Sequence, residues 1–201
     1  MSNPSPLPAA ESSTALPSRW ARLWRHLWVT DWQLRRALPP GALDHLQSTI
    51  SAGEELHTAQ VRFIVEADLD LLAVWRGQTP RERALELFAQ YHLWDTAANN
   101  GVLVYVQFAD RAVEIIADRG CNGRVSASEW SAVARGIRDA FATGRYLAGA
   151  VAGMEVVSVL LARQFPREAG DAKAATNCRI VLFCSRRFVC GGRAFGSFFR
   201  P

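Results

Sequence analysis

The stretch from Asp95 to Gly123 reads DTAANNGVLVYVQFADRAVEIIADRGCNG, and it decides the fold. Two runs of β-branched and aromatic residues flank the polar pair Asp110-Arg111, which is typical of a tight β-hairpin. A two-residue turn there places Val102 opposite Arg119. The polar, Gly-containing loops that precede and follow the hairpin are therefore expected to meet at one end of the sheet.

These two loops supply a candidate metal site. Side-chain oxygens are available from four residues: Asp95, Asn99, Asn100 and Asp118. Hard cations such as Ca²⁺ and Mg²⁺ take carboxylate, amide and carbonyl oxygens, so this set predicts part of a coordination shell, although the EF-hand spacing is absent. The alternative is turn chemistry, because Asp and Asn commonly cap backbone groups in tight loops.

The opposite end of the hairpin supplies a second candidate edge. Glu66 and Asp70 follow the first predicted strand, and Asp110 and Arg111 form the predicted turn. Ligands of open α/β sheets lie beyond the carboxyl ends of parallel strands, and an Arg fork suits phosphate. The alternative is a solvated acidic rim with one ion pair.

The rest of the chain predicts an α/β domain. A strand is expected at 59–66, and Thr79-Pro80-Arg81-Glu82 is a capping box with Pro at the first helical position. A strand, a helix and a second strand make a right-handed crossover with parallel strands. A second capping box at 126–129 opens a helix to about residue 143, and another helix follows to residue 164. We expect a βαββαα core with helices on both faces of a short mixed sheet, behind a leading helix at about 42–56.

Residues 18–37 are expected to form one amphipathic helix. Tryptophans repeat every four residues along one side of it, and arginines surround the remaining circumference. The tryptophans are Trp20, Trp24, Trp28 and Trp32. One interpretation is a helix that docks on the domain and completes its core with the tryptophans. The other is contact of Trp20, Trp24 and Trp28 with a membrane surface or a membrane-protein partner, because Trp and Arg suit headgroup depth and anionic lipid.

Composition bounds the remaining regions. Residues 1–17 are rich in Pro and Ser and are expected to be disordered, and 38–166 form the domain. The segment 167–201 is basic, contains three of the four cysteines and is expected to be an atypical disordered tail. Without that tail the net charge is close to zero, so a nucleic-acid partner is not expected.

Several features indicate a cytoplasmic protein, with peripheral membrane contact as an option. No signal peptide is visible, and Cys121 is an isolated cysteine that is expected to be packed rather than reactive. The apolar run 146–162 is shorter than a typical membrane span and contains Glu155, so a buried helix is favoured over a span. His45 and His57 are expected at the surface.

Several motifs together resemble one known family, the TPM domain family. They are the strand entry at 99–103, the turn at 109–111, the strand exit at 114–120 and the segment FATGRYLAG at 141–149. The resemblance covers about residues 30–165 and is closest to a short bacterial branch that lacks a signal peptide and a membrane anchor. It implies a Rossmann-like fold, calcium binding in some members and a low acid-phosphatase activity attributed to others. The Cys- and Arg-rich end departs from that branch.

The sequence contains no nucleophile elbow, P-loop, HExxH motif or dinucleotide fingerprint, so no nucleotide cofactor and no catalytic residue are predicted. Two hypotheses follow. The first is an accessory module that binds a divalent ion or a partner. The second is a metal-assisted hydrolase of the acid-phosphatase type, in which loop carboxylates hold the cation.

Overall fold

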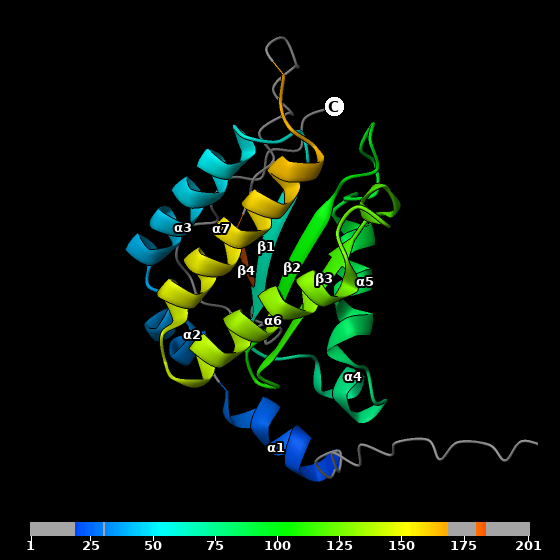
Figure 1. Cartoon of the computed structure of the whole chain (residues 1–201). Helices are drawn as coiled ribbons and strands as arrows, with labels where there is room; N and C mark the ends of the chain where they lie inside the picture. The colour runs from blue at the N-terminus through cyan, green and yellow to red at the C-terminus, as the bar shows by residue number, and fades with distance from the viewer. Residues whose placement is uncertain (1–18, 30, 169–179, 184–201) are drawn as a thin grey trace, which may run out of the picture.

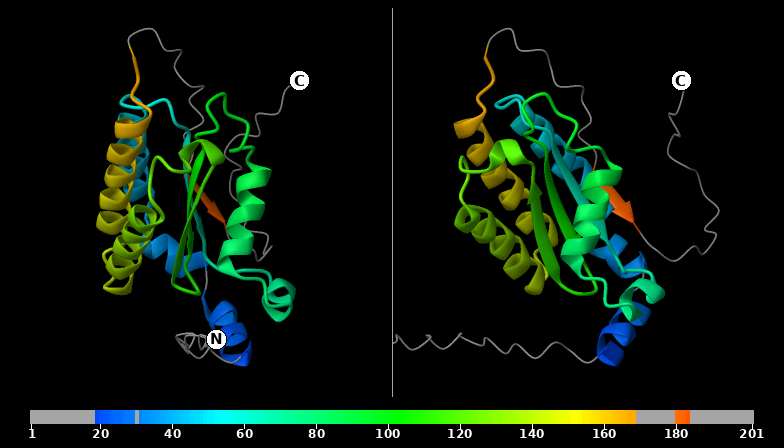
Figure 2. Two further views of the ribbon diagram at one scale, coloured as in Figure 1. Left: turned by 45° about the vertical axis from the view of Figure 1, so that its right-hand side comes forward. Right: turned by 90° about the vertical axis from the view of Figure 1, so that its right-hand side faces the viewer.

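The computed structural model describes residues 19–29, 31–168 and 180–183. The predicted tail at 1–17 and the C-terminal cysteines lie outside these ranges. The architecture is a three-layer α/β sandwich, as predicted: a mixed sheet lies between α5 on one face and α3, α6 and α7 on the other (Figures 1 and 2).

The sheet has the order β3-β2-β1-β4. β1 (Val61–Glu66) pairs in parallel with β2 (Val102–Gln107), and β3 (Ala112–Ala117) pairs antiparallel to β2, which confirms the predicted crossover and hairpin. β4 (Ile180–Phe183) pairs in parallel with β1. Four residues of the predicted disordered tail therefore form a strand, because the edge of β1 offers unpaired backbone groups that another strand satisfies.

The register of the hairpin differs from the prediction. Val102 pairs with Ala117 rather than with Arg119, and the connection is a four-residue loop at 108–111. The loop is stabilised by the side chain of Gln107, which accepts a hydrogen bond from the Asp110 amide at 3.0 Å, and by the left-handed backbone of Arg111, with φ of 53°. A shift of two residues keeps every side chain on its predicted face, so the ends of the hairpin still meet.

Both capping boxes are confirmed. Thr79 and Glu82 cap α5 (Pro80–Gln90), and Ser126 and Glu129 cap α6 (Ala127–Ala142). On α5, Leu87 faces inward and is buried, whereas Leu85 is exposed.

The predicted single helix at 18–37 is wrong. Two helices occupy the segment, α1 (Arg19–Trp28) and α2 (Asp31–Ala37). The two helices have different environments. α2 buries Leu34 in the main core, whereas α1 lies beyond the end of the sheet, against α4 (Leu71–Trp75; Figure 1). The β-branched Val29, which directly follows α1, disfavours a continuous helix.

Two further helices cover the main core: α3 (Pro40–Glu54) and α7 (Tyr146–Gln164). Among the described helices, only α7 is long and apolar enough to cross a membrane by length and composition. It packs instead against α3 and α6 and contributes Met154, Val157 and Leu161 to the core, as a buried helix was expected to.

His57 corrects another prediction, because it is fully buried rather than at the surface. Its Nδ1 lies 3.1 Å from the carbonyl oxygen of Ala59, and its backbone bridges to Pro166 at the end of α7. Burial lowers the pKa of His57 to about 4, so the ring is neutral at pH 7.

Candidate functional site

The loops before β2 and after β3 meet, as the hairpin predicted. The Asp118 amide donates to the Gly101 carbonyl at 2.9 Å, and the Gly120 amide donates to the Asn99 carbonyl at 2.8 Å. Arg119 Nε donates to Asn99 Oδ1 at 3.0 Å. A Cβ on Gly120 would overlap the carbonyl oxygens of Ala98 and Asn99, so the close approach requires glycine there.

Loop contacts occupy two side-chain oxygens of the predicted metal set, Asn99 Oδ1 and Asp118 Oδ1. Asp118 Oδ1 accepts from the Arg119 amide at 2.7 Å and caps a 3₁₀ turn, η1 (Arg119–Cys121). Asn100 is buried, and its amide nitrogen donates to Thr58 Oγ1 at 3.4 Å. Asp95 is exposed, and Asn99 has a left-handed backbone with φ of 50°.

A buried oxygen of this set remains available for a cation. Asp118 Oδ2 is buried and has no hydrogen-bond partner within the described part of the chain. Within the same part, no three His, Cys, Asp or Glu side chains form a group able to hold a metal. A Ca²⁺ ion at these loops would therefore need most of its oxygen ligands from groups other than carboxylates. The Arg119 guanidinium beside Asn99 disfavours a cation.

At the opposite end of the sheet, Glu66 is not part of a solvated acidic rim. It is buried, accepts hydrogen bonds from Arg83 Nη2 at 2.7 Å and from the Tyr105 hydroxyl at 2.7 Å, and lies between β1 and α5. The hydrogen bond to Glu66 raises the pKa of Arg83, and burial raises the pKa of Tyr105. Asp70 accepts from the Leu72 and Ala73 amides as the N-cap of α4. The carboxylates of Glu66 and Asp70 are therefore engaged in contacts that stabilise the fold.

Asp110 is the centre of a charged cluster that holds α1 on the hairpin loop. Arg22 donates to both carboxylate oxygens, with Nη2 at 2.7 Å from Oδ2, and His26 Nε2 lies 3.2 Å from Oδ2. Burial raises the pKa of Asp110, but the contacts with His26 and Arg22 outweigh burial and hold this pKa at about 2. His26 Nδ1 accepts from the Leu69 amide at 3.0 Å, which ties α1 to the chain after β1.

The contacts of Arg22 and His26 with Asp110 were not predicted from the sequence. Their signal was a four-residue spacing, which places both on one helical face opposite the tryptophans. Nothing in the sequence paired that face with Asp110, which lies 88 residues after Arg22.

Because the polar face of α1 docks, its tryptophans turn outward. Trp20, Trp24 and Trp28 are 65%, 57% and 71% exposed, so the interpretation that they complete the core is wrong. Trp20 packs edge-to-face on Trp75 of α4 at 5.6 Å, and Leu72 of α4 is also exposed. We call Trp20, Trp24, Trp28, Leu72 and Trp75 the Trp face.

The remaining candidate residues show no catalytic arrangement. Arg111 is exposed on the hairpin loop, where it lines a cleft beside α6. Cys121 is buried, and burial raises the pKa of its thiol to about 11, which is typical of a packed, unreactive cysteine.

Comparison with known proteins gives a family and a fold. A family model described as the TPM domain matches residues 34–159. No curated protein matches the chain. Among solved structures, the NMR structure of the BA42 protein from the psychrophilic bacterium Bizionia argentinensis is similar, with a TM-score of 0.61 and 24% sequence identity over 71% of this chain and 94% of that protein. At this identity the likeness shows the fold alone.

Proposed function

Because the chain belongs to the TPM domain family, we propose that it is an accessory binding module that docks on an anionic membrane surface through the Trp face. The family match carries no specific activity. One observation supports the proposal above all others: α1 is anchored by its charged side and presents three tryptophans to solvent. An ordinary amphipathic helix of a globular domain does the reverse.

The composition of the Trp face favours a lipid surface. Tryptophan prefers the membrane–water interface, where its ring is half buried and its N–H is hydrated. Exposed arginines flank the contact between α1 and α4, since Arg19 precedes Trp20 and Arg76 follows Trp75. Arginines beside exposed aromatics attract anionic headgroups. The location that follows is the cytoplasmic face of a membrane.

Co-sedimentation of the full chain with vesicles tests this proposal. Vesicles of phosphatidylcholine alone are compared with vesicles that also contain phosphatidylserine, for the parent protein and the double variant Trp24→Ser/Trp28→Ser. Each exposed ring contributes on the order of 1–1.5 kcal/mol if half of its area leaves water, so the double variant should bind anionic vesicles at least about tenfold more weakly.

Trp94→Ser is the matched control. Trp94 is 52% exposed but lies in the loop that precedes β2, at the opposite end of the sheet from α1. Its replacement should leave vesicle binding unchanged. Equal binding by the parent and the double variant would end the membrane proposal, and equal binding to neutral vesicles would remove the role of charge.

The alternative function is a metal-assisted hydrolase of the acid-phosphatase type, with Ca²⁺ or Mg²⁺ polarising a phosphoryl group near Asp118. Its support is the family and the buried, unpartnered Asp118 Oδ2. The binding module is favoured because the described residues bring no group of acidic or His side chains together at these loops. Metal-dependent turnover of an aryl phosphate that is lost in Asp118→Asn would reverse this preference.

A further inference from the structure

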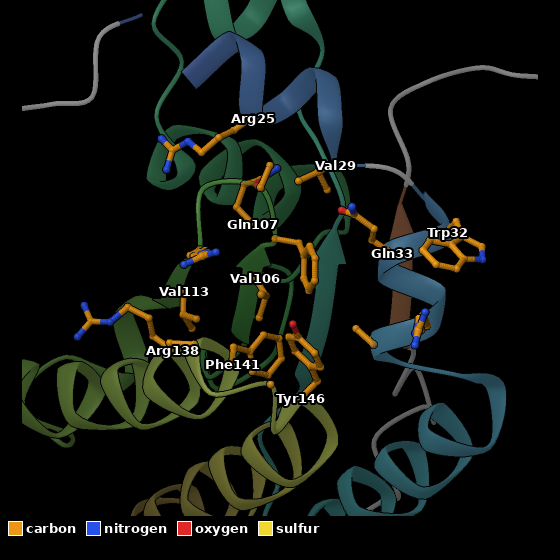
Figure 3. Close-up of a pocket in the computed structure, with 17 residues that line it drawn as sticks. Arg25, Val29, Trp32, Gln33, Val106, Gln107, Val113, Arg138, Phe141 and Tyr146 are labelled. Atoms are coloured by element: carbon orange, nitrogen blue, oxygen red, sulfur yellow. The ribbon is translucent and has the colours of Figure 1, made fainter. Parts of the chain in front are cut away.

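A cleft of about 840 Å³ lies beside the hairpin loop, between the helices α1 and α2 and the junction of α6 with α7 (Figure 3). Its volume suits a small organic ligand. Four arginines line it, from four different elements: Arg25, Arg36, Arg111 and Arg138. Among the described residues that line the cleft there is no Asp or Glu, so the charged side chains of its lining are all positive.

These arginines are weakly neutralised by the protein. Arg111 makes no side-chain hydrogen bond or ion pair with the described residues, and Arg138 contacts only its exposed neighbour Asp139, at 3.3 Å. Arg25 Nη2 lies 3.7 Å from Asp110, a carboxylate that already binds Arg22. The guanidinium groups therefore keep donors for a ligand.

Two buried donors at the cleft independently indicate an acceptor. Gln107 is fully buried, and its Oε1 accepts from the Asp110 amide, which fixes the orientation of its side-chain amide. Its Nε2 then has no hydrogen-bond partner in the described part of the chain, and the same holds for Arg25 Nε. Buried donors are rarely left unpaired in native proteins, so a ligand oxygen is expected here.

Part of the lining of the cleft is aromatic. Phe108 and Phe141 lie 5.5 Å and 5.3 Å from the ring of Tyr146, and Trp32 closes the side formed by α2. Tyr146 begins the 19-residue helix α7, whose N-cap Arg145 makes no side-chain cap, so the amino end of this helix adds positive potential. The ligand should carry an apolar or aromatic body beside its charged group.

We propose that this cleft binds a phosphate-type oxyanion attached to an apolar or aromatic body. Planar guanidinium forks match phosphate oxygens, and four arginines favour a dianion over a monocarboxylate. The site does not depend on membrane binding by the Trp face. Arg25, Val29, Trp32 and Gln33 precede the residues that match the TPM model, so the cleft is only partly built from the family domain.

Calorimetric titration of the full chain with phenylphosphonate tests the proposal, because this probe has a dianionic head and a ring and resists hydrolysis. Saturable binding is expected, and benzoate should bind more weakly. Arg111→Gln and Arg138→Gln should each weaken phenylphosphonate binding at least about tenfold. Both residues are exposed, so the variants should fold.

Arg119→Gln is the matched control, since Arg119 is an exposed arginine beside Asn99, at the opposite end of the sheet from the hairpin loop. It should change the affinity by less than about twofold, because removal of a distant surface charge is screened by salt. In NMR spectra the side-chain amide of Gln107 should shift with the probe. Absence of saturable binding, or an equal loss in Arg119→Gln, would overturn the proposal.

Two further arms separate the sources of the ligand and the two proposals. Vesicles with phosphatidic acid are compared with vesicles of equal charge made with phosphatidylserine. A selective loss of phosphatidic acid binding in Arg138→Gln assigns the ligand to a lipid headgroup, and its absence assigns a soluble organic phosphate. Trp24→Ser/Trp28→Ser should retain phenylphosphonate binding even if it loses vesicles.

Discussion

Replacement of Asp110 by Asn should release α1 from the domain. The pKa of Asp110 is held at about 2, against 3.8 for the ordinary carboxyl, and this difference corresponds to about 2.5 kcal/mol at pH 7. The side chain of Asp110 is only 8% exposed, so solvent screening removes little of this energy. The amide of Asn keeps the shape of the side chain but loses the charge that faces Arg22 and His26.

Hydrogen exchange of the α1 amides measures this release. A loss of about 2.5 kcal/mol in the free energy of local opening should speed exchange in Arg19–Trp28 by roughly 50- to 100-fold at pH 7, while β1 and β2 change little. Asp139→Asn is the control, because Asp139 is 69% exposed and pairs only with its neighbour Arg138. It should leave α1 unaffected.

The same linkage gives a pH dependence. The pKa of Asp110 is lowered by folding, so its contribution is complete above about pH 4 and is lost as the pH falls towards about 2. The parent protein should therefore lose α1 protection in that window, and Asp110→Asn should show no such step. Equally slow α1 exchange in the parent and in Asp110→Asn at pH 7 would refute the assignment of Asp110 as the anchor.

Three other predictions follow from single residues. His57 has a pKa of about 4 in the folded protein, below its ordinary value of 6.5, so the unfolded chain binds a proton first as the pH falls. The free energy of unfolding should therefore fall by on the order of 2–3 kcal/mol between pH 6.5 and 4. Urea unfolding should show a flatter pH profile for His57→Gln but not for His45→Gln. Gly120→Ala should lower the free energy of unfolding, measured by thermal unfolding, by more than about 2 kcal/mol, because the added Cβ meets two carbonyl oxygens. Gly136→Ala, which has open space on a helix, should raise the free energy of unfolding by about 0.5–1 kcal/mol. Equal effects of the two variants would contradict the packing around Gly120. If the loops bind Ca²⁺, a titration followed by backbone NMR should shift the resonances of residues around Asp118 in the parent protein, and the same resonances should not shift in Asp118→Asn. Shifts spread over the whole surface would rule out this site.

The elements that the sequence predicted well are those with local causes. Thr79 with Glu82, and Ser126 with Glu129, satisfy orphan amides within four residues, so both helix starts were readable without tertiary information. The crossover and the hairpin follow from the order of strand and helix and from the handedness rule. The meeting of the Asn99 and Asp118 loops follows from that hairpin, and survived an error of two residues in register.

The candidate sites depended on contacts that are distant in the sequence. Glu66 was noticed as an acidic residue, but its burial depends on Arg83 and Tyr105, which lie on other elements. Gln107 ends β2, and nothing in its position along the chain shows that its side-chain amide is buried in the folded protein. A residue pattern contains no information on which distant partner will neutralise a charge.

The orientation of α1 shows the division most clearly. The sequence by itself determined that this segment is helical and that its tryptophans share one side, because spacing alone sets which residues share a face, but it extended the helix to residue 37. It did not determine which side docks, since either side suits some surface. The tertiary structure decided this by placing the carboxylate of Asp110 under Arg22 and His26, where a buried charge must be paired, and the tryptophans were left in solvent as a consequence.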